Sequence, residues 1–399
     1  MLKRLHLLLA LFILTVNAAM AQITTSGISG KITSDGENVI GATVTATHQP
    51  SGTVYRAVTN IDGRYTIQGM RPGGPYKVDI SYIGYKDKVI KNLNLSLGET
   101  ENISCSLQED AHQLQEVVVS GKAGLAASRT GAATSMTAEQ INNMPSITHG
   151  IADVARLNPQ LTVTNSGNMS FAGVNNRYNN FMIDGAANND VFGLASSGNN
   201  GGQAGAQPVS METIEQIQVS VAPFDVRQSG FTGGAINAIT KSGTNQFHGS
   251  AYYYGYNQDL IGTKYPYLDG TGYAPKYQKQ TQYNMGVTLG GPIIKNKLFF
   301  FANYERTNKE YPNLYGVDSG NSKVNTEQAK DILTMLQKIA EKQGVNFNDY
   351  YSNQDIYTKS DKAGLKLDWN INEFNKFAIR WSLVKAEQLS GGGSASSLN

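Results

Sequence analysis

Apolar and polar residues alternate with a period of two along much of residues 22–108. The alternating segments are short and are separated by turn residues such as Asp35-Gly36 and Asp62-Gly63. Successive side chains of a strand point to opposite faces, so this period predicts half-buried strands. Short strands that follow each other at this spacing are typical of a small all-β sandwich, which we expect over this range.

The pattern becomes mixed between residues 125 and 243. Thr137 followed by Gln140 resembles a capping box, and apolar residues recur with helical spacing from Ile151 to Leu157. Strand-like pieces follow, separated by a loop that is rich in Gly, Asn, Ser and Gln. We therefore expect a mixed α/β unit that carries one long polar loop.

Longer alternating segments with many aromatic residues occupy residues 244–399. Leu365, Leu367 and Trp369 share one face of a predicted strand, and Lys366 lies on the other face. Strands of about ten residues with this alternation and with aromatic ends are typical of transmembrane β-barrels. We find about five such strands, joined alternately by short turns and long connections.

One of the long connections, residues 309–358, contains a predicted helix. Ile332, Leu333, Leu336 and Ile339 recur there at helical spacing. We expect an amphipathic helix in an extracellular loop.

The first 21 residues have the pattern of a secretory signal peptide. Lys3 and Arg4 precede an apolar run from Leu7 to Val16, and small residues end at Ala21. The run is too short to span a bilayer as a helix, which takes ~20 apolar residues. We expect cleavage after Ala21 and export from the cytoplasm.

Charge and cysteine content exclude two further features. The net charge is +2, and Lys and Arg form no run beyond the first few residues, so we expect no nucleic-acid partner. Cys105 is the only cysteine, which leaves no intrachain disulfide, and its alternating segment predicts a small core residue.

The first predicted unit resembles a known domain. The order ISGKITSDGENVIGATVTA followed by TNIDGRYTIQGMRPGGPYKVDISYIGYK is similar to the carboxypeptidase regulatory-like domain. A peptidase would need metal ligands, and the five histidines are scattered without a His-Glu-x-x-His pair. The resemblance therefore implies a binding or spacing module.

Three motifs mark the second unit: IDG at residues 183–185, IEQIQV at 214–219 and GGAINAITK at 233–241. In this order they resemble the plug of TonB-dependent outer-membrane receptors. The segment VAPFDVRQSGFTGG stands in place of the family's usual Arg-Gly-Pro and resembles the Oar-like branch, whose substrates are broad or unknown.

The resemblance implies a mainly β architecture. We expect a β-sandwich at residues 22–108, a linker at 109–124, an α/β plug at 125–243 and the first strands of a transmembrane antiparallel β-barrel at 244–399. Barrels that enclose a plug have ~22 strands, so about five strands form an incomplete barrel. We therefore expect an N-terminal fragment of a receptor.

The resemblance also implies candidate residues in the plug. Gly233, Gly234 and Asn237 would form its structural motif, and the two glycines would permit close approach of the backbone to the barrel wall. The candidates for facing a substrate are polar side chains, namely Asn179, Asn180, Asp184, Asn188, Asn189 and Asp190. Turn formation is the alternative role for the asparagines.

The linker contains QLQEVVVSG, a strand-like segment at the family's position for the TonB box. We expect Glu116, Val117, Val118 and Val119 to contact the periplasmic protein TonB by adding a strand to its sheet. Such a strand would have no partner in its own chain. The alternative is that the valines form the last strand of the sandwich.

The implied function is energy-coupled uptake of an unidentified substrate by a TonB-dependent transporter or receptor in the outer membrane of a Gram-negative cell. Catalytic residues, cofactors and metal ligands are not expected. The partners would be TonB with its inner-membrane energising complex, outer-membrane lipid and an unknown extracellular substrate. Specificity would come from residues 186–207, 258–279 and 309–358. The alternative is a surface binding or adhesion protein, or a truncated fragment that transports nothing.

Overall fold

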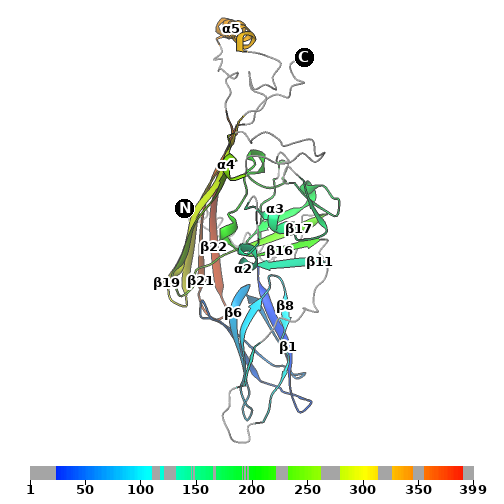
Figure 1. The fold of residues 1–399 in the computed structure, drawn as a ribbon. Coiled ribbons are helices and arrows are strands. Elements are labelled where there is room, and N and C mark those ends of the chain that lie inside the picture. The colour runs from blue at the N-terminus through cyan, green and yellow to red at the C-terminus, as the bar shows by residue number, and fades with distance from the viewer. Residues whose placement is uncertain are drawn as a thin grey trace, which may run out of the picture.

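The chain forms three units that follow one another in sequence. The computed structural model describes residues 24–109, 117–120, 132–144, 146, 149–164, 168–190, 192, 195, 197–221, 232–261, 279–312, 326–344 and 355–389. Figure 1 shows a sandwich (β1–β10) below a plug (β11–β17), with a wall of five long strands (β18–β22) along one side. The helices in these ranges are too short or too polar to cross a bilayer.

The sandwich consists of two five-stranded sheets. One contains β1 (Ser26–Ser34), β2 (Glu37–Asn38), β5 (Arg64–Met70), β8 (Thr100–Asn102) and β9 (Cys105–Ser106). The other has the order β10 (Val117–Ser120), β7 (Lys88–Leu95), β6 (Gly73–Ser81), β3 (Thr43–His48) and β4 (Thr53–Val58). Alternate residues of β3 are buried, as the period of two predicts. The core between the sheets includes fully buried Ile28, Ile32, Tyr76 and Ile80.

His48 is a polar member of this core. It is 5% exposed, its Nδ1 lies 2.7 Å from the Ser51 hydroxyl, and its ring centroid is 4.9 Å from that of Tyr76. Burial, helped by the positive charge of Arg71, lowers the pKa of His48 to about 3. The imidazole is therefore neutral in the folded sandwich at every physiological pH.

We expect this histidine to make the sandwich sensitive to acid. Unfolded His48 titrates near the ordinary histidine pKa of 6.5, so between this value and about 3 the unfolded state binds more protons than the folded state. The free energy of unfolding should thus fall by about 2–3 kcal/mol between pH 7 and about pH 4.5. Hydrogen exchange of β3 and β6 at the two pH values measures this loss, and a His48→Gln variant should show a clearly smaller one.

The plug is a five-stranded sheet with two short helices. The sheet order is β11 (Ala132–Thr137), β16 (Ile214–Val221), β17 (Gly234–Thr240), β14 (Asn180–Ile183) and β15 (Ala186–Ala187). A small hairpin pairs β12 (Leu161–Val163) with β13 (Met169–Phe171). Every residue of β17 is buried, so this strand lies at the centre of the plug.

The two predicted helices are present. In α2 (Ala138–Asn142) the expected capping box is formed, because the Thr137 side chain accepts from the Gln140 amide and the Gln140 side chain accepts from the Thr137 amide. The second helix, α3 (Ile151–Ala155), ends sooner than the apolar spacing indicates. Leu157 therefore lies beyond the helix and is exposed.

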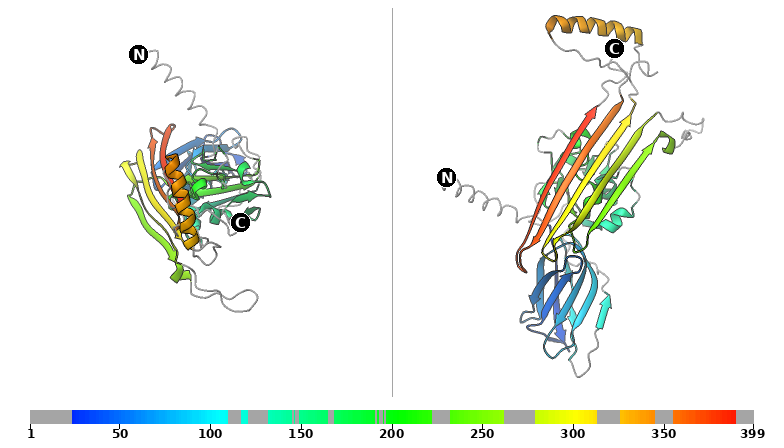
Figure 2. Two further views of the ribbon diagram at one scale, coloured as in Figure 1. Left: turned by 90° about the horizontal axis from the view of Figure 1, so that it is seen from above. Right: turned by 90° about the vertical axis from the view of Figure 1, so that its left-hand side faces the viewer.

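The wall is an antiparallel sheet whose strands are joined in sequence order. It consists of β18 (His248–Asn257), β19 (Thr281–Ile294), β20 (Leu298–Tyr311), β21 (Ile356–Asn370) and β22 (Lys376–Leu389). The five expected strands are thus confirmed, and in the part that the structure describes they do not close into a barrel. Figure 2 shows them side by side and tilted, with the plug behind them.

The two ends of the wall differ. Short turns join β19 to β20 and β21 to β22 at the end that adjoins the sandwich. The long connections lie at the other end and carry α4 (Gln258–Ile261) and α5 (Thr326–Gln343). The predicted amphipathic helix is therefore confirmed as α5, with Leu333 buried and Ile332, Leu336 and Ile339 exposed.

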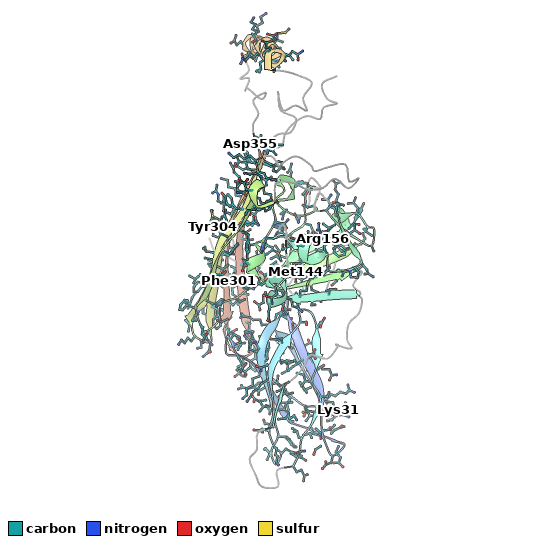
Figure 3. The ribbon with its side chains drawn as sticks, in the orientation of Figure 1. Lys31, Met144, Arg156, Phe301, Tyr304 and Asp355 are labelled. Carbon is teal, nitrogen blue, oxygen red and sulfur yellow. The ribbon has the colours of Figure 1, made fainter. Side chains whose placement is uncertain are left out.

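The two faces of the wall also differ. In Figure 3, Tyr304 and Phe301 are labelled on β20; Tyr304 is 43% exposed on the outer face and Phe301 is 3% exposed towards the plug. The outer face is largely apolar and carries Val287, Leu289, Leu365, Trp369, Phe377, Ile379, Trp381 and Leu383. The inner face is mixed: beside Phe301 it carries buried polar side chains such as Glu305, Lys362 and Lys366. This confirms the expected alternation and is typical of a barrel wall that separates lipid from a hydrated interior.

Candidate functional site

The valine segment of the linker forms a strand within its own chain. Val117, Val118 and Val119 pair in parallel with Lys88, Val89 and Ile90 of β7. The expectation that this segment has no partner in its own chain is therefore wrong, because β7 offered an open edge at the side of the sandwich. Glu116 lies outside the described residues.

Asp184 ties the plug to the wall. It follows β14 with a left-handed φ of 48°, and its two carboxylate oxygens accept from the amide of Thr240 at 2.9 Å and from its hydroxyl at 2.6 Å. Lys366 Nζ on β21 lies 3.3 Å from Asp184 Oδ1, and Arg380 Nε on β22 lies 3.4 Å from Oδ2. The Asp184 carboxylate therefore binds the wall, and a substrate-facing role for Asp184 stays a prediction.

A second polar contact joins the plug to the wall. Glu305 of β20 forms a buried ion pair with Lys362 of β21. The same carboxylate accepts from the hydroxyls of Ser210 in the plug and Tyr252 in β18, each at 2.6 Å. One buried carboxylate thus joins β18, β20 and β21 of the wall to the plug.

These contacts were not anticipated from the sequence. The signal available was the placement of charges, because Lys362 and Lys366 fall on the inner face of a strand whose outer face is apolar from Ala363 to Trp369. That placement indicates a buried partner for each lysine. It does not indicate which acidic residue supplies the partner.

The remaining polar candidates mainly stabilise the loop after β14. Asn179 Nδ2 donates to the carbonyl of Met169 at 2.8 Å. Asn189 accepts from the Phe181 amide and donates to the Asn180 side chain, at 2.8 and 3.1 Å. The Asp190 carboxylate accepts from the Phe192 amide at 3.0 Å. These contacts fit the turn-forming alternative better than a substrate-facing role.

Asn188 differs from its neighbours. Among the described residues its buried side-chain oxygen has no hydrogen-bond partner. A buried acceptor without a partner is unusual, so Asn188 stays a candidate for contacting substrate.

The glycine motif packs within the plug. A Cβ added to Gly234 would lie 2.5 Å from the ring of Phe171, and one added to Gly233 would lie 2.5 Å from Asn179 Oδ1. The close approach therefore involves other plug residues, and the expectation that it involves the barrel wall is wrong. Asn237 is 2% exposed at the middle of β17, between β16 and β14.

Three domain families match the chain in the order of the three units. The carboxypeptidase regulatory-like domain matches residues 27–108, the TonB-dependent receptor plug domain matches residues 126–236 and the outer membrane beta barrel domain matches residues 239–319.

Curated relatives carry the same family name. The TonB-dependent transporter Oar of Myxococcus xanthus is 29% identical over 273 residues, which are 65% of this chain and 24% of the relative. A probable TonB-dependent siderophore receptor PirA of Acinetobacter baumannii is 25% identical over 188 residues, 43% of this chain and 22% of the relative. The chain thus spans about a quarter of the length of these relatives.

Solved structures also resemble part of the chain. The crystal structure of the siderophore receptor PirA from Acinetobacter baumannii matches with a TM-score of 0.44 and 19% identity, over 67% of this chain and 34% of that chain. The three matched domains, their order and the Oar relative thus make this chain similar to the TonB-dependent outer-membrane receptors.

Proposed function

We propose that this chain supplies the gated entrance of a TonB-dependent transporter that imports an unidentified substrate across the outer membrane. The observation that carries the proposal is the plug sheet, which is held against the inner face of the wall by Asp184 and Glu305. Buried polar contacts of this kind hold a plug in place and can be broken without exposing an apolar core. The long connections at the far end of the wall would select the substrate.

TonB would transmit energy to the transporter through the valine strand, β10. After cleavage behind Ala21, export would leave the sandwich and β10 in the periplasm, where TonB is located. β10 lies at the edge of its sheet, so TonB would either pair with the free side of β10 or draw it away from β7. Residues 116–119 are the proposed contact.

A peptide that spans Glu109–Gly124 is expected to bind the periplasmic domain of TonB. A Val118→Pro peptide should bind about tenfold more weakly or not at all, because proline lacks the backbone donor and resists strand pairing. Fluorescence anisotropy with labelled peptides measures both affinities.

Val118→Thr is the matched control, since threonine is β-branched and keeps the backbone N–H. It should bind nearly as well as the natural peptide. Equal binding by all three peptides, or binding by none, would contradict the proposed contact and would assign the valines to the sandwich alone.

A further inference from the structure

Two glutamines of the plug hold the backbone of the sandwich. Gln216 Nε2 donates to the carbonyl of Leu95 at 2.9 Å, and Gln216 Oε1 accepts from the amide of Leu97 at 2.8 Å. Gln218 Nε2 donates to the carbonyl of Leu97 at 3.0 Å. Both glutamines belong to β16, and Leu95 is the last residue of β7.

These three hydrogen bonds are buried. Gln216 is 2% exposed, Gln218 6%, Leu95 2% and Leu97 0%. A buried backbone group that loses its partner is strongly destabilising, so the contact is either made in full or opened to water. Glutamate would fit at either position but has no N–H to donate to a carbonyl.

The sandwich also contacts the short turns of the wall. Arg56 Nη1 lies 2.6 Å from Glu373 Oε1, between β21 and β22. Asn370 Nδ2 donates to the Thr53 hydroxyl at 2.9 Å, and Lys376 Nζ lies 3.8 Å from the centre of the Tyr55 ring. The sandwich thus contacts the plug and the wall at once.

The three units meet around a cavity. Its volume is about 480 Å³, and its lining includes Arg71 from the sandwich, Glu215 from the plug and Asp368 from the wall. Burial raises the pKa of the Glu215 carboxyl. The junction thus contains charged side chains from all three units, whereas the cores of the sandwich and the plug are clusters of apolar residues.

We propose that the sandwich is a releasable latch, which ties the plug to the wall at the end with the short turns. The trigger for release rests on the proposed function. β10 pairs with Lys88–Lys91 of β7, and the two glutamines contact Leu95, the last residue of β7, and Leu97, two residues beyond it. A pull on residues 117–120 therefore acts on β7 and on this contact as well as on the chain that leads to β11.

Hydrogen exchange of the intact receptor tests the latch without TonB. A Gln216→Glu/Gln218→Glu variant removes both donors to the sandwich. The amide of Leu97 and the amides of β14, β16 and β17 are expected to exchange at least about tenfold faster, while those of β3 and β6 stay unchanged. Gln160→Glu is the matched control, because Gln160 is exposed on the plug, and it should leave all of these rates as they are.

Faster exchange at Leu97 alone, with unchanged exchange in β14 and β17, would overturn the proposal. The sandwich would then contact the plug without stabilising it. If the glutamine variant fails to fold, an Arg56→Gln/Lys376→Met variant tests the latch from the wall. It should also speed exchange in the plug, and unchanged rates would again overturn the latch. TonB is absent from this experiment, so failure of the peptide to bind TonB would leave the result intact.

Discussion

Replacing Asp184 with alanine is expected to lower the free energy of opening the plug sheet by about 3 kcal/mol, because Lys366 and Arg380 would remain facing the plug without their counter-charge. The amide and the hydroxyl of Thr240 would lose their acceptor as well. Alanine also fits the left-handed backbone at this position poorly. Hydrogen exchange at β14 and β17 in the purified receptor measures the loss.

Asp184→Asn is the matched control for this change. Asparagine tolerates the left-handed backbone and keeps an acceptor for Thr240, but it carries no charge. The asparagine variant should therefore lower the free energy of opening the plug sheet by less than the alanine variant does. If both variants exchange like the natural protein, the contact between plug and wall contributes nothing to the position of the plug.

Replacing Glu305 with alanine should destabilise the wall by about 3–5 kcal/mol, because Lys362 would be left as an unpaired buried charge. Ser210 and Tyr252 would lose their acceptor in the same step. The midpoint of thermal unfolding of the purified protein, followed by the loss of its β-sheet circular dichroism, should fall by several degrees.

A double variant separates the effect of the buried charges on stability from the effect of side-chain packing. Glu305→Gln/Lys362→Met removes both charges at similar volume and should recover much of the stability that Glu305→Ala loses. Glutamine also keeps an acceptor for the two hydroxyls, so a double variant that is as unstable as the single variant would contradict the unpaired charge of Lys362 as the cause of the loss.

The wall was predictable from the sequence because two different solvents impose its pattern. Lipid on one side and the hydrated plug on the other force alternation with a period of two, which placed Leu365, Leu367 and Trp369 correctly on the outer face. Helix α2 was predictable for a local reason, since the capping box joins Thr137 to a residue three positions away.

Contacts between distant segments were not predictable. Asp184 and Lys366 are 182 positions apart, and their alternation patterns show that each is polar but not that they meet. The same limit applies to the valine strand, because a run of valines predicts a strand without specifying the edge that it joins. Sandwich and plug both offered edges, and the structure places β10 on β7.

The difference between the two ends of the wall has a consequence for how such receptors diversify. Turns at the sandwich end are fixed in length by their contacts, as at Glu373 with Arg56 and Asn370 with Thr53. Among the described residues, the connections at the far end have no such contacts with the sandwich, and each doubling of a flexible loop costs only about 0.6 kcal/mol. Mutation can therefore lengthen and reshape the connections at the far end of the wall while the turns at the sandwich end keep their length.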